Sequence, residues 1–555
     1  MLPSPSAAST TASQLLRLAR PTAARAYGGS PGGPALPNAA AAGAAARLDE
    51  PGYMGYLSNA VSNIITNLSW NSTAPATPPP ETAANAKQKA RPIVLRVSRD
   101  EVTATTTALV KKLLLSEETD SKIRRMRQLS DHLQTYPATR LSAVQEPQLI
   151  SLLLECESSA EERMREEARM CLALCGFVKP PRGHGYNLLT IDGGGTRGMM
   201  GLEILEALEN ATGKKVHELF DHVVGVSTGA IIAVMLGVKK MSVAQCRQGK
   251  VVDQGYGSYR AVMLGVKKMS VAQCRQKYME ISRKLFSQGV WAGATGLVLN
   301  HSYYDTKKWV LMLKEILGEE SMIWTARAEG TPNISIVSSI VNLPQLQPFI
   351  HRNYETPSGK ESHYRGGTGH QLWQAVQAVQ ASAAAPGYFE EVVLGDILHQ
   401  DGGVIANNPT ALGVHEARNC WPAEQLQCLV SIGNGRTVQE LEPTPMFSSS
   451  GTRHKLLKII DSATDTESVH VAMSDLLPES AYYRFNPYMS HSYGLDEIDA
   501  LRLEQMVLDA KLYVRRNEEK IEAAAEQLIR KETKWQSLAR SALDLKNRKG
   551  YYTPM

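Results

Sequence analysis

Three short motifs in this chain of 555 residues carry side chains or backbone groups that could act together on one substrate. One of them is Gly225-Val-Ser-Thr-Gly229, in which Ser227 has a glycine two residues away on either side. A serine on a sharp strand-to-helix turn needs such small neighbours, because its strained backbone passes close to adjacent chain. The spacing predicts a nucleophile elbow with Ser227 as the nucleophile. The alternative is a glycine-flanked turn serine without reactivity.

A hydroxyl group is a poor nucleophile until a base accepts its proton, so an activated serine implies a partner. Downstream, Asp401 stands in the turn Asp401-Gly-Gly403, whose open backbone allows a carboxylate to project. The apolar residues 392–398 precede it, and burial beside them would raise the pKa of the carboxyl group toward neutrality. An isolated Asp-Gly-Gly is usually only a turn, so the assignment of Asp401 as the base depends on the other motifs.

The third motif, Asp192-Gly-Gly-Gly-Thr-Arg-Gly198, is a glycine-rich loop. Such a loop presents backbone N–H groups at the start of a helix and can hold an anion, because no side chain blocks the approach. The anion could be a nucleotide phosphate or a transient oxyanion. The candidate oxyanion-binding residues are Gly193, Gly194, Gly195, Thr196, Arg197 and Gly198.

The glycine spacing of this loop also fits the fingerprint of dinucleotide-binding proteins, which is a weak signal when it stands alone. That class needs an acidic residue about 20 positions further on to bind the ribose, and Glu218 or Asp221 could serve. The glycine-flanked serine would then have no explanation. A nucleotide-binding regulator is therefore kept as an alternative function.

Each motif follows a segment with the pattern of a strand. Residues 186–191 run straight into the glycine loop, and residues 222–224 run into the serine motif. Leucines at helical spacing continue from the loop to Gly213, and the apolar residues 230–236 follow the serine. In both places the order is strand, loop and helix.

The three motifs together resemble those of the patatin-like phospholipase family, and residues 383–389 and 401–409 look like two further blocks of it. The similarity covers roughly residues 185–490. It implies a three-layer α/β/α core and hydrolysis of acyl esters by a Ser–Asp dyad, without calcium or another cofactor. In that scheme Ser227 attacks the ester carbonyl, Asp401 takes the proton, and the backbone of the glycine loop stabilises the oxyanion. His399, two residues before Asp401, is expected to have no catalytic role.

The expected function is a calcium-independent phospholipase that cleaves fatty acyl esters of membrane glycerophospholipids, releasing free fatty acid and lysophospholipid. Its expected partner is the surface of a phospholipid bilayer. A net charge of +5 is too small to indicate nucleic-acid binding, and no EF-hand loop or dense acidic cluster indicates a metal site. A catalytically impaired membrane scaffold is the second alternative, and the oligomeric state is left open.

The amino-terminal residues 1–48 contain no Asp or Glu, and four arginines stand among Ser, Thr, Ala and Leu. This composition predicts a mitochondrial presequence, with a disordered Ala-rich tail as the alternative. Residues 49–98 read as an amphipathic and Pro-rich linker, either a membrane-surface helix or a solvated segment. The longest apolar run, residues 230–238, is about half of the roughly 18 residues that a membrane-spanning helix needs. Peripheral membrane association is therefore expected.

Two further regions are expected to be helical and to serve packing. Residues 99–180 have the pattern of a helical, armadillo-like module, and residues 491–555 that of a charged helical tail. The seven cysteines contain no CxxC pair, which favours reduced thiols and an intracellular protein.

One feature departs from the family pattern. Residues 233–248 recur without a change at residues 261–276. Without residues 249–276, Gln248 would join Lys277 in one continuous amphipathic segment. We therefore expect this insert to be a mistaken gene model, a duplicated exon or a splice form. A second copy of the segment that follows Ser227 would compete with the first and threaten its register.

Overall fold

The computed structural model describes residues 98–238, 304–318, 321–357, 360–367, 375–437 and 466–552. The chain divides into two units between Ile93 and Val94, and all of the described residues belong to the second. The predicted presequence, nearly all of the predicted linker and the insert of residues 249–276 lie outside the described residues.

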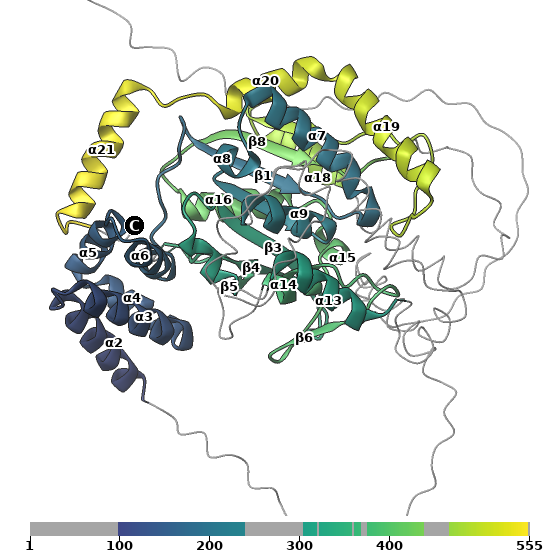
Figure 1. The fold of residues 1–555 in the computed structure, drawn as a ribbon. Coiled ribbons are helices and arrows are strands. Elements are labelled where there is room, and N and C mark those ends of the chain that lie inside the picture. Colours follow the sequence, from purple (N-terminus) through teal and green to yellow (C-terminus); the bar gives the residue numbers. More distant parts are fainter. Residues whose placement is uncertain are drawn as a thin grey trace, which may run out of the picture. The chain divides into compact units, whose positions relative to one another are not determined.

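The described part is built around a nine-stranded sheet, in which seven strands follow the order β5-β4-β3-β2-β1-β8-β9 (Figure 1). The other two lie off this path, with β7 paired to β3 and β6 paired to β7. The central strands β3, β2, β1, β8 and β9 are parallel, whereas β4 and β7 both pair antiparallel with β3. The strands are β1 (Tyr186–Ile191), β2 (His222–Val226), β3 (Asn333–Ile340), β4 (Gln347–Arg352), β5 (Arg365–Gly367), β6 (Val392–Leu394), β7 (Ile397–Asp401), β8 (Leu426–Ile432) and β9 (Tyr482–Phe485).

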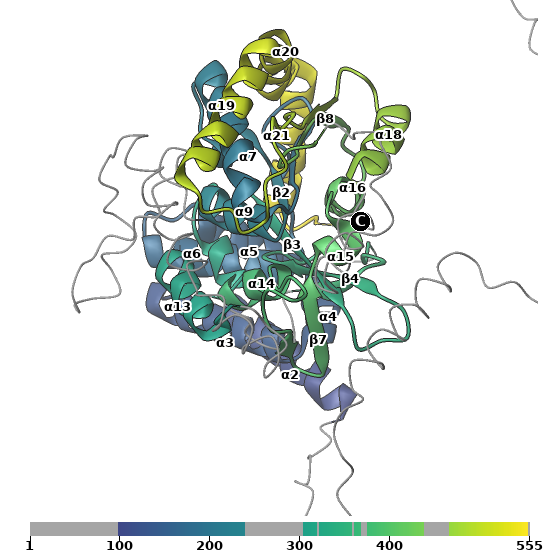
Figure 2. The same cartoon turned by 90° about the vertical axis from the view of Figure 1, so that its right-hand side faces the viewer.

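Helices cover both faces of the sheet, as Figure 2 shows with the strands between them. Leu189 and Ile191 of β1 point into one core, with α7 (Gly198–Thr212), α9 (Thr228–Gly237), α13 (Thr306–Leu317), α14 (Ala375–Ser382) and α20 (Glu518–Leu528). Tyr186 and Leu188 point into the other core, with α16 (Thr410–Cys420). Alternation along a strand sends successive side chains to opposite faces, and every residue of β1 is buried. The expected α/β class is confirmed.

Three more helices and two short ones complete the part around the sheet. These are α8 (Val216–Leu219), α15 (Gly403–Ala406), α18 (Thr466–Leu476), α19 (Ala500–Arg516) and α21 (Lys534–Arg548). A buried cluster of Met199, Met200, Leu503, Met506 and Val507 joins α19 to α7, next to the glycine loop. Among the described residues, no helix combines the length and the apolar character that crossing a membrane requires.

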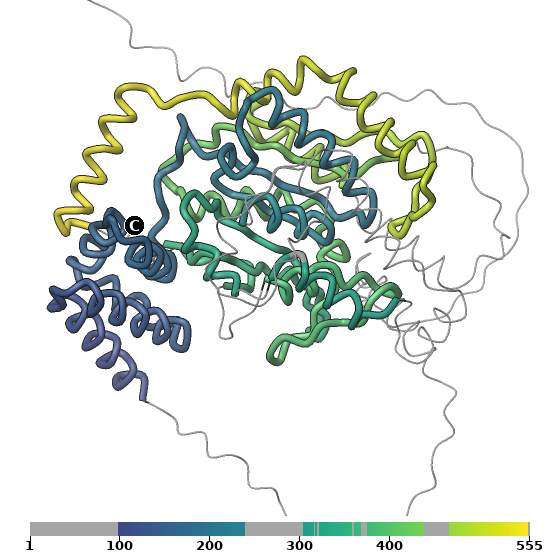
Figure 3. Tube along the Cα trace, in the orientation of Figure 1, coloured from purple at the N-terminus to yellow at the C-terminus, as the bar shows by residue number. Residues whose placement is uncertain are grey.

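The helical region expected before the sheet is present. It contains α2 (Arg99–Leu114), α3 (Thr119–Thr135), α4 (Arg140–Val144), α5 (Pro147–Glu157) and α6 (Glu162–Leu174), which share a core of their own. Arg140 pairs with Glu355 at 2.6 Å, and Arg169 Nη1 donates to the carbonyl of Arg327 at 2.9 Å, so this region is fastened to the residues around β3 and β4. The carboxyl-terminal α21 returns beside α5, as the trace in Figure 3 shows, and Arg548 donates to Ser158 at 3.0 Å.

Candidate active site

Ser227 lies between the end of β2 and the start of α9, in the sharp turn that its flanking glycines predict. Its φ is 54°, and among the described residues it is the one non-glycine residue with positive φ. A Cβ at Gly225 would lie 2.3 Å from the carbonyl oxygen of Gly229, and a Cβ at Gly229 would lie 2.3 Å from that of Ile191. Both glycines are therefore required by backbone-to-backbone contact. Strain of this kind persists only where the surroundings enforce it, and it occurs mainly at functional sites.

Strand β3 places Asp401 beside this turn. On one edge of β3, Val337 pairs with Val226, the last residue of β2, and Ser338 pairs with Asp401, the last residue of β7. The other edge of β3 is occupied by β4, so β2 and β7 run toward each other along the same edge and meet end to end. As a result Ser227 Oγ donates a hydrogen bond to Asp401 Oδ2 at 2.7 Å.

The Asp401 carboxylate is buried and bonded on both oxygens. Oδ1 accepts a hydrogen bond from the backbone N–H of Gly403 at 2.7 Å, while Oδ2 accepts from Ser227. Burial raises the pKa of Asp401 to about 6, although the bonds from Ser227 and Gly403 act in the opposite direction. A carboxylate with this pKa is mostly ionised at neutral pH and is basic enough to accept a proton in a reaction there.

Ser382, at the end of α14, connects the serine turn to the aspartate turn. Its hydroxyl accepts a hydrogen bond from the backbone N–H of Ser227 at 2.9 Å and donates to the carbonyl of Val337 at 2.6 Å. Its carbonyl accepts from the N–H of Gly402 at 3.1 Å. The sequence signal was the block at residues 383–389, which begins one residue later, so sequence reasoning missed this contact.

His399 is not part of the Ser227–Asp401 pair. Its Nδ1 lies 3.0 Å from Ser338 Oγ, and its ring lies against those of Phe349 and His351. Burial lowers the pKa of His399 to about 4. The hydrogen bond between Ser227 and Asp401 is direct, and no imidazole stands between the two side chains.

The glycine loop follows β1 and comes close to Ser227. A Cβ at Gly193 would lie 3.2 Å from Ser227 Cβ and 2.4 Å from Asn407 Oδ1, so only a glycine fits there. Asn407 also fixes the backbone, because its carbonyl accepts the N–H of Gly193 at 3.2 Å. The Asn-Asn-Pro sequence after Asp401 therefore holds the loop, a role that the sequence alone did not assign to it.

Most backbone N–H groups of the loop are already engaged. Gly193 donates to Asn407, Thr196 to the carbonyl of Leu495 at 2.9 Å, and Arg197 to that of Gly194 at 3.1 Å. Gly198 donates to the carbonyls of Gly195 and Thr196, in the short turn that precedes it. Within the described part of the chain, the N–H of Gly194 has no acceptor, which leaves it available to an anion. Of the six residues expected to bind an oxyanion, Gly194 is therefore our candidate for the donor.

Asp221 and Glu218, the acidic residues considered for ribose binding, bind backbone N–H groups instead. Asp221 precedes β2, at the opposite end of that strand from Ser227, and accepts the N–H of Asn187 at 2.9 Å. Glu218 caps α8 by accepting the N–H of Lys215 at 2.8 Å. A ribose-binding acid belongs at the carboxyl ends of the strands, so this geometry speaks against a dinucleotide site. In the part of the chain that the structure describes, there is no group of three or more His, Cys, Asp or Glu that could hold a metal ion.

Comparison with known proteins agrees with these motifs. A family model described as patatin-like phospholipase matches residues 189–413. The calcium-independent phospholipases A2-gamma of Oryctolagus cuniculus and Homo sapiens are 39% and 38% identical to the chain over 447 and 461 residues. The alignments cover 80% and 82% of this chain but 52% and 54% of those proteins, so the chain spans about half of their length.

Two more distant matches were found. Phospholipase A I of Arabidopsis thaliana is 30% identical over 408 residues, which cover 65% of this chain and 30% of that protein. Among solved structures, VipD from Legionella pneumophila matches with a TM-score of 0.28 and 13% identity, covering 60% of this chain and 67% of that one. The structural likeness is too weak to support an argument.

Proposed function

Because this chain belongs to the patatin-like phospholipase family, with the matching domain at residues 189–413, we propose that it is a calcium-independent phospholipase. Its substrates are the fatty acyl esters of membrane glycerophospholipids, and its products are free fatty acid and lysophospholipid. The observation that carries the proposal is the 2.7 Å hydrogen bond from Ser227 Oγ to Asp401 Oδ2 at a strained strand-to-helix turn. The names of the relatives supply the substrate class.

In the proposed mechanism Asp401 accepts the hydroxyl proton as Ser227 Oγ attacks the ester carbonyl carbon. The carbonyl oxygen becomes an oxyanion, which the N–H of Gly194 stabilises. The N–H of Thr228 is a second donor, since it lies in the first turn of α9, where a helix offers no internal acceptor. The intermediate collapses, the ester C–O bond breaks, and Asp401 returns the proton to the departing lysophospholipid oxygen.

The resulting acyl-enzyme is hydrolysed by the same groups. Asp401 takes a proton from a water molecule, whose oxygen attacks the acyl carbonyl carbon. A second oxyanion forms and collapses, the bond to Ser227 Oγ breaks, and Ser227 regains a proton from Asp401. The fatty acid leaves, and both side chains are back in their starting protonation states.

The location of the protein is part of the proposal. The acid-free residues 1–48 direct it to mitochondria, where it associates with a membrane surface through apolar and basic segments such as residues 53–99. A fluorescent reporter fused behind residues 1–60 should accumulate in mitochondria. A reporter that stayed diffuse in the cytosol would refute the targeting proposal without affecting the enzymatic one.

A catalytically impaired scaffold is the second candidate, and one observation favours it. The segment that begins inside α9, directly behind Ser227, is duplicated in the sequence at residues 261–276. A second copy able to take the place of the first would disturb the helix on which the nucleophile depends.

The test is labelling by a fluorophosphonate probe in the presence of EGTA, followed by phospholipid hydrolysis. Three proteins are compared: the full chain, its Ser227→Ala variant, and the chain without residues 249–276. Labelling and hydrolysis by the full chain that vanish in Ser227→Ala would support the phospholipase. Activity only in the shortened chain would mean that the insert disables the enzyme, and none in either would favour the scaffold.

A further inference from the structure

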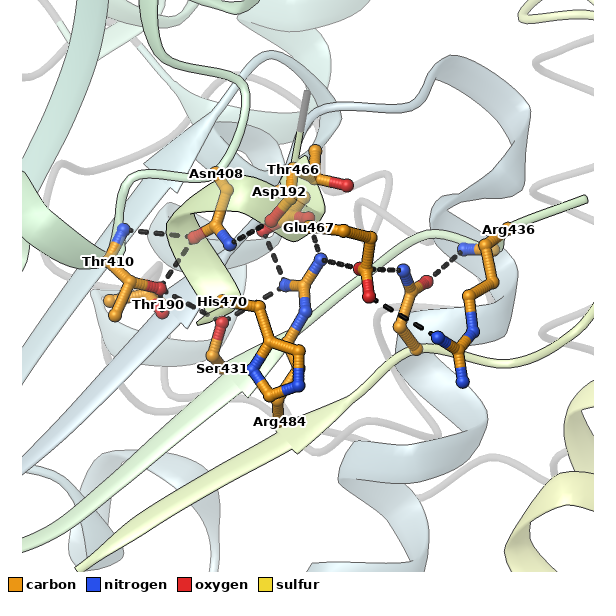
Figure 4. A network of polar contacts seen from close by, with 12 residues as sticks. Thr190, Asp192, Asn408, Thr410, Ser431, Arg436, Thr466, Glu467, His470 and Arg484 are labelled. Atoms are coloured by element: carbon orange, nitrogen blue, oxygen red, sulfur yellow. Dashed lines mark hydrogen bonds and ion pairs between the residues drawn. The ribbon is translucent and has the colours of Figure 1, made fainter. Parts of the chain in front are cut away.

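Asp192, the first residue of the glycine loop, forms a buried ion pair that the loop sequence does not predict. Asp192 and Arg484 of β9 form two hydrogen bonds, from Nη1 to Oδ1 at 3.0 Å and from Nη2 to Oδ2 at 2.7 Å (Figure 4). Both side chains are only 2% exposed. A bidentate pair of this kind fixes the orientation of a carboxylate as well as its charge.

The guanidinium of Arg484 is itself held in place by the sheet. Thr190, Ser431 and Arg484 are in register across β1, β8 and β9, and Arg484 Nη1 donates to Ser431 Oγ at 3.0 Å. Glu467, at the start of α18, lies 3.4 Å from Nη2 and also accepts a hydrogen bond from Asn486 at 2.8 Å. Arg484 therefore spans from the edge strand to the centre of the sheet, with hydrogen-bond partners along its path.

The backbone of Asp192 is equally constrained. Its N–H donates to the carbonyl of Ile432 at 2.9 Å, and its carbonyl accepts from Asn434 Nδ2 at 2.6 Å. With the carboxylate bound to Arg484, every polar group of Asp192 has a fixed partner. The available N–H of Gly194 follows two residues later, so the direction of that N–H depends on where Asp192 is held.

We propose that Arg484 is a positioning residue for the reaction: by holding Asp192, it orients the glycine loop so that the Gly194 N–H faces the oxyanion. This inference rests on the proposed phospholipase function. An oxyanion donor stabilises the transition state only when it is placed in advance, and a displacement of about 1 Å can cost about 100-fold in rate. Without the guanidinium, a buried carboxylate would be left unpaired at the root of the loop, and the loop would move or the carboxylate would become protonated.

The structure offers a matched control. Arg352 and Glu416 form another buried bidentate pair, with Nε–Oε2 at 2.7 Å and Nη2–Oε1 at 2.9 Å. This pair lies near His222, at the end of β2 away from Ser227, with Tyr354 between them. Arg352→Lys and Arg484→Lys thus make the same chemical change in equally buried pairs, but only Arg484 is connected to the glycine loop.

The experiment measures kcat and KM on phospholipid in mixed micelles, and inhibition by a long-chain trifluoromethyl ketone, which forms a tetrahedral adduct with the serine. Circular dichroism gives the folded fraction, and a non-hydrolysable ether phospholipid reports ground-state binding. We expect Arg484→Lys to lower kcat about 10-fold or more and to weaken inhibition by the ketone by a similar factor. KM and binding of the ether lipid should change less than about 2-fold, because the loop donor acts on the oxyanion and not on the bound ester. Arg352→Lys should keep the wild-type kcat per folded molecule.

A second set of variants tests the same inference if Arg484→Lys does not fold. If Arg484→Lys does not fold, Glu467→Gln and Ser431→Ala remove single supports of the guanidinium and should each lower kcat about 3-fold, again at constant KM. Asp192→Asn and Arg484→Met should also be combined in a double variant. Its fold-loss in kcat should be smaller than the product of the fold-losses of the two single variants.

The possible results separate the inference from the proposed function. If kcat and inhibition by the ketone are unchanged in folded Arg484→Lys, or in both Glu467→Gln and Ser431→Ala, the positioning role is refuted. The proposed phospholipase function is not affected by that result. Equal losses in Arg352→Lys and Arg484→Lys would also overturn it, since they would indicate general destabilisation. A wild-type protein with no more activity than Ser227→Ala would refute the proposed function, and the inference with it.

Discussion

The backbone N–H of Ser227 donates to the hydroxyl of Ser382, so a residue from α14 holds the strained turn of the proposed nucleophile. The same hydroxyl donates to β3, and the carbonyl of Ser382 accepts from the turn of the proposed base. One buried serine therefore restrains both members of the proposed dyad.

Replacing Ser382 should lower activity, because its hydroxyl bonds the turn that carries Ser227. In Ser382→Ala the N–H of Ser227 and the carbonyl of Val337 lose their buried partner, which costs about 1–3 kcal/mol of unfolding free energy. The turn can then relax, and we expect kcat to fall about 10-fold. Chemical denaturation and phospholipid hydrolysis measure the two effects.

The control for this change is Ser335→Ala. Ser335 is a buried serine of β3 whose hydroxyl contacts His222 and Tyr354, each at 2.9 Å, away from the dyad. It should lose comparable stability and keep its activity per folded molecule. A similar loss of kcat in both variants would contradict a specific role for Ser382.

The activity should fall on the acidic side of neutrality. The base must be ionised to accept a proton, and the pKa of Asp401 is raised to about 6 by burial, so kcat/KM should rise with pH through about 6 and then level off. Burial also raises the pKa of Asp192 to about 6, and its protonation would weaken the ion pair with Arg484. The acidic limb should therefore be steeper than the titration of one proton. A limb centred near pH 4, with folding intact by circular dichroism, would contradict the assignment of the base.

The Asp401→Asn variant should be inactive and yet more stable than the wild type at high pH. A buried acid whose pKa is raised from 3.8 to about 6 binds its proton more tightly in the folded state, so ionisation destabilises the fold as pH rises through this range. An uncharged amide avoids that cost, which is roughly 3 kcal/mol or less at pH 8. The gain in unfolding free energy should shrink toward zero near pH 4. Unfolding by urea at both pH values measures it, and equal stability of the two proteins at pH 8 would contradict the buried, ionised carboxylate.

The elbow glycines should differ sharply from other glycines of the chain. In Gly229→Ala the new Cβ would meet the carbonyl of Ile191 at 2.3 Å, so we expect a loss on the order of 3 kcal/mol and no fluorophosphonate labelling. Gly213 has a φ of +67° but nothing within 4 Å of an added Cβ. Gly213→Ala should therefore cost only about 1 kcal/mol, from backbone strain, and label normally. Labelling of Gly229→Ala at the wild-type rate would show that the turn tolerates a side chain.

The parts of the site that could be predicted from sequence are those determined by local constraints. The spacing of Gly225, Ser227 and Gly229 reflects contacts within one turn, and each motif follows its strand directly, so the candidate residues could be derived. The α/β class followed from the resemblance of these motifs to a known family. Asp401 was assigned because the three motifs occur together, since nothing near it in sequence indicates that β7 runs antiparallel to β3 and ends opposite Ser338.

The remaining contacts depend on which strands become neighbours. Arg484 is 292 positions from Asp192, and Asn434 is 242 positions from it, yet both meet it because β8 and β9 extend the sheet beyond β1. A single arginine in an aromatic strand segment carries no local sign of such a partner. In the same way, the sequence could not tell which N–H groups of the glycine loop are taken up by Asn407 and Leu495.

The meeting of β2 and β7 on one edge of β3 also has a consequence for how this kind of protein can vary. The proposed nucleophile and the proposed base are each aligned by β3, at Val337 and Ser338, and not by the length of chain that separates them. We therefore expect that the lengths of the loops between these elements can vary without changing the distance between the two side chains. We also expect the fold to allow reconstitution from two fragments divided between α9 and β3.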